Sequence, residues 1–120
     1  VVFTGWTKDV PEILSLSHFT LLPSVDEALG IVLMEGMAAG TPIIAREGEG
    51  GAELIQDYET GFIYKSYEGI DPLVNEVLSL LKNQQRYEAL SLVCREVALR
   101  DFASHRFGAK LVDVYAEVTR

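Results

Sequence analysis

Short apolar runs alternate along the chain with longer segments in which apolar residues recur every three or four positions. Each short run spans four or five residues and is followed by glycine, proline or polar residues, a pattern typical of a buried strand. The pattern therefore predicts four strands, over residues 1–4, 19–22, 42–45 and 60–64.

Two short helices are predicted between these strands. Asp9 is a suitable N-cap and Glu12 follows it by three residues, so a capping box predicts a helix that ends near residue 17. A second helix is expected over residues 31–39, with Gly40 as its C-terminal stop.

The second half of the chain is predominantly helical. A glycine-rich loop over residues 47–51 precedes one or two helical turns at residues 52–55. Asp71 and Ser104 are the expected caps of later helices. Three apolar stripes at helical spacing consist of Leu73, Val77, Leu80 and Leu81; of Tyr87, Leu90, Cys94 and Val97; and of Phe107, Leu111, Val114 and Val118. Cys94 is thus expected to be a small core residue rather than a nucleophile.

This order of elements predicts the fold class. Strands that alternate with helices, and that are apolar throughout, are typical of an α/β protein whose sheet is parallel. We therefore expect a parallel sheet of about four short strands with helices packed on it. The 120 residues of the chain correspond to one domain or part of one. Because the chain opens at Val1 on an apolar run, we expect it to be a fragment of a longer protein.

Charge and composition exclude several function classes. Ten basic residues against eighteen acidic ones give a net charge of −8, which argues against a nucleic-acid partner and against an anionic membrane surface. The single cysteine cannot form an internal disulfide, which excludes a disulfide scaffold. One cysteine and two histidines are also too few ligands for a Cys/His zinc site. The longest nearly uncharged stretch, residues 28–45, contains Glu35 and Pro42, so no integral membrane segment is expected.

Candidate chemistry lies between the second and third predicted strands. The loop over residues 23–30 leaves the carboxyl end of a strand and enters a helix, whose first amide groups form a ready anion site. Glu35 lies one turn into that apolar helix, where a buried carboxylate needs partners, and it is expected to lean back toward the anion. It could accept hydrogen bonds from the two hydroxyls of a ribose. Glu27, on the loop, could reach the group beyond the phosphates.

These residues carry a family resemblance. The sequence EALGIVLME at residues 27–35 resembles the E-x7-E signature of retaining glycosyltransferases with the GT-B fold, especially glycosyltransferase family four (group 1). Other segments that resemble the family, in the same order, are residues 9–11, 22–24, 36–45, 50–53, 60–62 and 115–118. The family usually has Gly-Phe-Gly where this chain has Ala28, Leu29 and Gly30.

The resemblance implies a place in the family's architecture. Residues 1–120 would form the second half of the C-terminal, Rossmann-like, nucleotide-sugar-binding domain of a GT-B enzyme. The family's basic residues that neutralise the diphosphate, and its acceptor domain, would precede Val1. The isolated chain is therefore expected to be catalytically silent.

The resemblance also implies residue roles. Glu35 would bind the donor ribose, and Glu27, the candidate catalytic residue, would contact hydroxyls of the transferred sugar. Backbone groups of Ala28, Leu29, Gly30 and Ile31 would complete the substrate-binding loop, with the amides around Leu29 to Ile31 on the distal phosphate. The reaction would be sugar transfer to an acceptor hydroxyl with retention of configuration, and it would need neither a metal nor a cofactor.

The expected partners are a nucleotide-diphosphate sugar and an unknown acceptor, which could be a saccharide, a lipid or a small molecule. The resemblance places the whole protein in the cytoplasm or at the membrane periphery. An exposed sheet edge where upstream strands belong could pair with a second copy. The alternative function is a non-catalytic nucleotide-binding, sugar-phosphate-binding or self-associating α/β module, since a fold does not fix a function.

Overall fold

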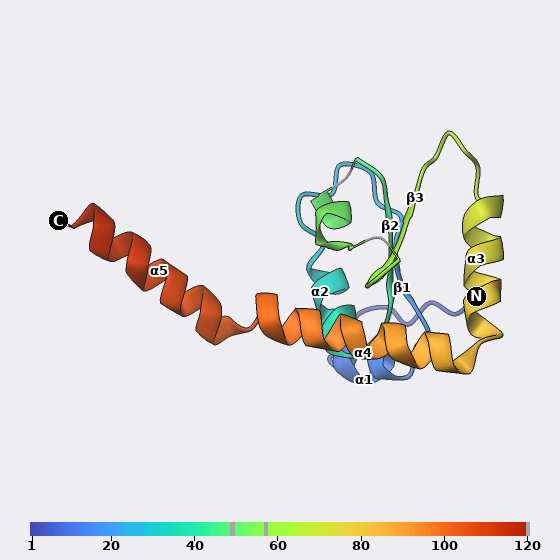
Figure 1. Ribbon diagram of the computed structural model, residues 1–120, viewed down its shortest axis with the longest axis horizontal. Coiled ribbons are helices and arrows are strands. Elements are labelled where there is room, and N and C mark those ends of the chain that lie inside the picture. Colours follow the sequence, from blue (N-terminus) through green and yellow to red (C-terminus); the bar gives the residue numbers. More distant parts are fainter. Residues whose placement is uncertain (49, 57, 120) are drawn as a thin grey trace.

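The computed structural model describes residues 1–48, 50–56 and 58–119. Helices cover both faces of a small sheet, and the last helix extends away from the rest (Figure 1). In chain order the elements are α1 (Val10–Ser15), β1 (Thr20–Leu22), α2 (Ile31–Ala38), β2 (Ile43–Arg46), the 3-10 helix η1 (Gly50–Leu54), β3 (Gly61–Tyr64), α3 (Asp71–Leu81), α4 (Gln84–Asp101) and α5 (Ser104–Val118).

The sheet is parallel, as the sequence predicts, and its strand order is β1-β2-β3. Thr20 pairs with Ile43, and Ile43 in turn pairs with Gly61, so the three strands start level with one another. Their carboxyl ends therefore meet at one edge of the sheet, where the loops to α2, η1 and α3 begin.

The sequence expectation of four strands is wrong for the described residues, in which the sheet has three. The first apolar run, residues 1–4, forms no strand, and Val1, Val2 and Phe3 are almost fully exposed. A strand exists only when a neighbour accepts and donates its backbone hydrogen bonds, and this segment pairs with none of the three strands. β1 consequently forms one edge of the sheet.

The predicted helices form, but several start differently from the sequence interpretation. The Asp9 carboxylate does not cap α1, because the residue is not in the extended conformation that an N-cap needs; it accepts a hydrogen bond from the Thr7 hydroxyl instead. Asp71 and Ser104 each lie one residue inside their helices rather than at the cap. α4 has a side-chain cap that the sequence analysis missed, since Asn83 Oδ1 accepts from the Arg86 amide at 3.0 Å.

Two apolar layers enclose the sheet, and the alternation of side chains along β2 divides the strand between them. Ile43 and Ala45 face the layer formed with α2 and α4. Ile44 faces the opposite layer, formed with Phe62 of β3, with α3 and with the start of α4. α4 therefore contributes to both layers, and it crosses beneath the sheet in Figure 1.

Cys94 lies in the α2-side layer, as expected of a core residue, and its side chain is fully buried. Its thiol donates a hydrogen bond to the Thr60 carbonyl at 3.0 Å. Burial raises the pKa of the Cys94 thiol to about 12, so the thiol stays protonated throughout the neutral range.

Cys94 is therefore expected to resist alkylation in the folded chain. Iodoacetamide at about pH 8 should leave the native protein unmodified, because the thiolate is the reactive form and water does not reach it. The same reagent in denaturant should add one carbamidomethyl group, measured by intact mass. Equal rates under the two conditions would contradict the burial of the thiol.

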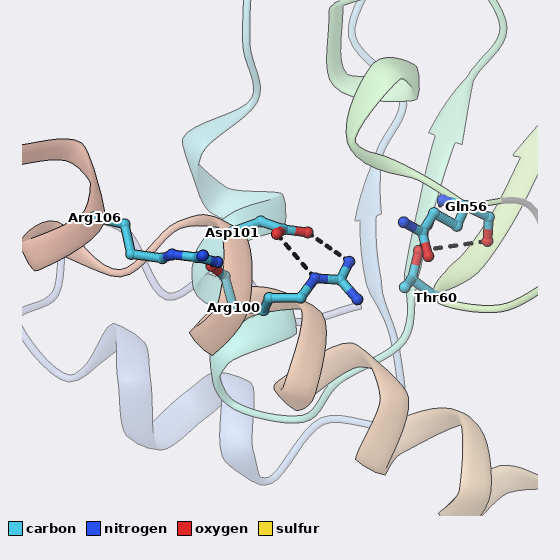
Figure 2. Close-up of polar contacts among 5 residues, drawn as sticks. All are labelled: Gln56, Thr60, Arg100, Asp101 and Arg106. Carbon is cyan, nitrogen blue, oxygen red and sulfur yellow. Dashed lines mark hydrogen bonds and ion pairs between the residues drawn. The ribbon is translucent and has the colours of Figure 1, made fainter. Parts of the chain in front are cut away.

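Exposed polar contacts join α4 to α5. Figure 2 shows Arg100 paired with the adjacent Asp101, whose carboxylate accepts from Nε at 2.9 Å and from Nη2 at 2.6 Å. The hydrogen-bonded Arg100 guanidinium lowers the pKa of the Asp101 carboxyl. Arg106, at the start of α5, donates to the Arg100 carbonyl. The rest of α5 buries none of its residues, and within the described chain no helix has the length and apolar character needed to cross a bilayer.

A side-chain contact closes the turn that leads into β3. The Thr60 hydroxyl accepts from the Gln56 amide at 3.0 Å and lies 3.4 Å from the Gln56 carbonyl (Figure 2). Thr60 is fully buried, so the turn is fixed against the core just before the strand begins.

Candidate functional site

The loop between β1 and α2 lies where the sequence predicts an anion site, at the carboxyl edge of the parallel sheet. Gly30 is the N-cap of α2 and has a φ of +72°, a conformation that residues with a side chain rarely adopt. A Cβ added to Gly30 would also lie 2.8 Å from Leu22 Cδ2. The backbone angle therefore favours glycine, and a side chain there would also have to displace the end of the Leu22 side chain.

The Glu27 carboxylate caps this helix entrance. Its Oε1 accepts a hydrogen bond from the Gly30 amide at 3.0 Å and a longer one from the Leu29 amide at 3.3 Å. An acidic group is stabilised there because the first amides of a helix lack intrahelical acceptors and carry partial positive charge. Two of the amides that the sequence analysis assigns to a phosphate, those of Leu29 and Gly30, therefore bind a carboxylate of the chain itself.

The glycine-rich loop after β2 packs against the same entrance. The Gly50 amide, at the start of η1, donates to the Glu27 carbonyl at 2.8 Å. Glu49, which the sequence also places in this loop, lies outside the described residues. The sequence analysis missed the contact between the two loops; its only signal is a pair of adjacent glycines following the neighbouring strand.

Glu35 is exposed, which corrects the expectation of a buried carboxylate. α2 packs on the sheet through Leu33, Gly36 and Met37. Position 35 is two residues from both Leu33 and Met37, and two residues rotate a helix by about 200°, so Glu35 lies on the opposite face. Ile31, one turn earlier, shares this exposed face.

The surroundings of Glu35 include a cation that the sequence analysis missed. Glu35 borders a cavity of about 380 Å³ between α1, α2 and α4. The cavity is also lined by Pro11, Ser15, Ala38, Ala39 and Arg95. Arg95 comes from α4, sixty residues later in the chain, so sequence spacing gave no reason to associate it with Glu35.

The structure thus gathers most of the predicted site at one helix entrance. Glu27 is partly buried, Gly30 is buried, and Ala28, Leu29 and Ile31 are exposed around them. Glu35 lies one turn further along α2, on the outer face of the helix. The arrangement places one carboxylate on the amides at the entrance of α2 and a second, exposed carboxylate one turn further along the helix.

Comparison with known sequences assigns the chain to a family. The sequence model of the family described as Glycosyl transferases group 1 matches residues 1–94. The chain belongs to this family. The match confirms the expected group 1 family, and the structure confirms the expected α/β architecture with a parallel sheet.

Two curated relatives of this group 1 glycosyltransferase chain carry the names of enzymes. It is 30% identical over its whole length to N-acetyl-alpha-D-glucosaminyl L-malate synthase of Bacillus anthracis, of which it covers 31%. It is 31% identical to a GDP-mannose-dependent alpha-(1-6)-phosphatidylinositol monomannoside mannosyltransferase of Mycobacterium tuberculosis, with 94% of the chain and 31% of the relative aligned. The chain thus spans about a third of the length of these relatives.

Solved structures share the fold. HepE of Anabaena in complex with UDP superposes with a TM-score of 0.84 at 21% identity, over 96% of this chain and 32% of HepE. The C-terminal domain of a group 1 family glycosyl transferase from Francisella tularensis gives a TM-score of 0.70 at 16% identity, over 87% of this chain and 53% of that domain. At these identities the comparison describes the fold, and it supports the GT-B assignment.

Proposed function

We propose that this chain forms part of the donor site of a retaining, family-four glycosyltransferase that transfers a sugar from a nucleotide-diphosphate sugar to an acceptor hydroxyl. One observation carries the proposal most directly: the Leu29 and Gly30 amides already bind a carboxylate at the carboxyl edge of a parallel sheet. Helix N-terminal amides that hold a carboxylate are suited to a phosphate. HepE, which shares the fold, was solved with UDP and with UDP-glucose.

In this proposal the donor replaces the internal contact. The distal phosphate takes the amides of Leu29, Gly30 and Ile31, and the Glu27 carboxylate turns to the hydroxyls of the transferred sugar. Glu35 accepts hydrogen bonds from the ribose hydroxyls. The exposure of Glu35 supports this role, because an exposed carboxylate can reach a ligand without rearrangement of the core.

The proposed reaction breaks the bond between the anomeric carbon and the distal phosphate oxygen. A new bond joins that carbon to the acceptor oxygen on the same face of the sugar, and the acceptor proton passes to the departing diphosphate. The amides at the start of α2 stabilise the negative charge that develops on the phosphate, a role that requires no metal ion and no cofactor.

The remaining proposals concern the whole protein. Its acceptor is a saccharide, a lipid or a small molecule, and it acts in the cytoplasm, where it can associate peripherally with a membrane. The 120-residue chain alone transfers no sugar, because the acceptor side and the basic diphosphate ligands are supplied by other segments. The β1 edge of the sheet can pair with a second copy.

Replacing Glu35 by alanine is expected to weaken binding of the nucleotide-sugar to the whole protein by about tenfold, since two charge-assisted hydrogen bonds to ribose are lost. The donor is first chosen by a thermal-shift panel of UDP-, GDP- and ADP-sugars, and the affinity is then measured by calorimetry. Glu117→Ala removes another exposed carboxylate, from α5, and serves as the matched control. An unchanged affinity in Glu35→Ala would overturn the ribose assignment.

The alternative, a non-catalytic binding module, predicts a different outcome for the whole protein. Such a module would bind a nucleotide-sugar in the thermal-shift panel but would release no nucleoside diphosphate in the presence of acceptors. Release of nucleoside diphosphate together with a glycosylated product would establish the enzyme.

A further inference from the structure

We propose that Gly50 is a positioning residue for the donor loop, defined here as residues 27–30, and that any side chain at position 50 would impair sugar recognition by Glu27. The inference rests on the proposed function, because it concerns what the donor loop presents to a nucleotide-sugar. It assigns to the second loop a role in shaping the site, without a contact to the ligand.

The first step is the contact between the two loops. The Gly50 amide donates to the Glu27 carbonyl at 2.8 Å, so the main chain of the glycine-rich loop fixes the peptide that follows Glu27. The Glu27 side chain in turn accepts from the Leu29 and Gly30 amides. One residue is therefore held at its carbonyl by the neighbouring loop and at its carboxylate by its own helix entrance.

The second step is the space around Gly50. A Cβ at this position would lie 2.0 Å from the Ala28 carbonyl oxygen and 2.6 Å from the Ala28 carbonyl carbon. Both atoms belong to the backbone, so no side-chain rotation can relieve the overlap. The overlap with the Ala28 carbonyl makes the requirement for glycine steric.

The third step is the consequence for the donor loop. To accommodate a methyl group at position 50, the Ala28 carbonyl would have to retreat by about 1 Å, and displacements of that size in a binding site are costly. In the sequence, Ala28 lies between Glu27 and the two residues whose amides bind the Glu27 carboxylate. The movement would therefore break the contact between the carboxylate and the amides in the free protein, and it would displace both from the positions at which the sugar and the phosphate meet them.

The adjacent glycine provides a matched comparison. A Cβ on Gly51 would meet only side chains, the nearest being Leu33 Cδ1 at 3.0 Å and Leu22 Cδ2 at 3.4 Å. Gly51→Ala therefore perturbs the core beneath the loop without touching the Ala28 carbonyl. A purely structural role for the glycine pair predicts similar behaviour of Gly50→Ala and Gly51→Ala, whereas the positioning role predicts different behaviour.

The first measurement requires no ligand. In the ¹⁵N-labelled whole protein, Gly50→Ala should increase the hydrogen exchange of the Leu29 and Gly30 amides by about tenfold relative to the amides of α2, because their acceptor is displaced. Gly51→Ala should leave this ratio unchanged. Equal ratios in the two variants would overturn the inference, whatever ligand the whole protein binds.

The second measurement uses UDP and UDP-glucose with the whole protein, or GDP and GDP-mannose if it binds neither uridine ligand. The ratio of the two dissociation constants reports the sugar's contribution, which Gly50→Ala should reduce by about tenfold while Gly51→Ala retains it. A wild-type ratio in Gly50→Ala would overturn the inference while leaving the proposed function intact. Failure of the wild-type protein to bind any donor would overturn the proposed function, and with it the role assigned to Gly50 in sugar recognition.

Discussion

Replacing Glu27 by glutamine is expected to lower kcat/KM for sugar transfer by the whole protein by about a hundredfold. Glutamine keeps an oxygen that can accept from the Leu29 and Gly30 amides, so the helix entrance retains its cap. It loses the negative charge that strengthens hydrogen bonds to sugar hydroxyls. The variant therefore separates the proposed chemical role of the side chain from its structural role.

Two measurements accompany this variant. Thermal unfolding should be close to that of the wild-type protein, because substitution of a partly exposed residue that keeps its hydrogen bonds rarely changes stability by more than about 0.5 kcal/mol. Glu59→Gln, at an exposed turn before β3, makes the same chemical change away from the donor loop and should retain full activity. Wild-type kcat/KM in Glu27→Gln would show that the residue only caps α2.

The sequence correctly predicts the three strands that pair with a neighbouring strand, and it wrongly predicts a strand over residues 1–4, which pair with none. Residues 19–22, 42–45 and 60–64 each lie within one residue of an observed strand, because apolar runs of that length are buried between helices in a parallel sheet. Residues 1–4 carry the same local pattern. Local pattern cannot report whether a neighbouring strand is present to accept the hydrogen bonds.

The candidate site shows a similar division. The position of Glu27 and Gly30 at the entrance of α2 follows from local turn and helix signals, and the structure places them there. Whether Glu35 is buried or exposed could not be predicted in the same way. α2 carries apolar residues on both faces, so its periodicity does not identify which face is buried. The exposure of Glu35 depends on which face the sheet occupies.

Contacts between distant segments account for what the sequence analysis missed. Gly50 contacts the donor loop because the two loops follow neighbouring strands of the sheet. That position 50 requires glycine becomes clear only when the location of the Ala28 carbonyl is known. Arg95 reaches the cavity beside Glu35 because α4 crosses beneath the sheet. Neither residue belongs to a motif that spacing alone could identify.

Leu33→Ala is expected to produce the largest loss of stability, about 3 kcal/mol in the free energy of unfolding. Leu33 of α2 is fully buried, in the apolar layer that α2 forms with β2, η1 and α4. Truncation removes its buried methyl groups and leaves a cavity that the surrounding backbone cannot fill. The Leu33 side chain also supports Gly51, so the cavity would loosen the floor of the donor loop.

The measurement is urea denaturation followed by circular dichroism, with Leu92→Ala as the matched control. Leu92 lies on α4 with 63% of its surface exposed, so the same truncation there should change the free energy of unfolding by less than about 0.5 kcal/mol. A similar small change in Leu33→Ala would contradict the packing of α2 on the sheet. Because the donor loop is built on the first turn of α2, that result would also remove the structural basis for placing Glu27 and Gly50 together.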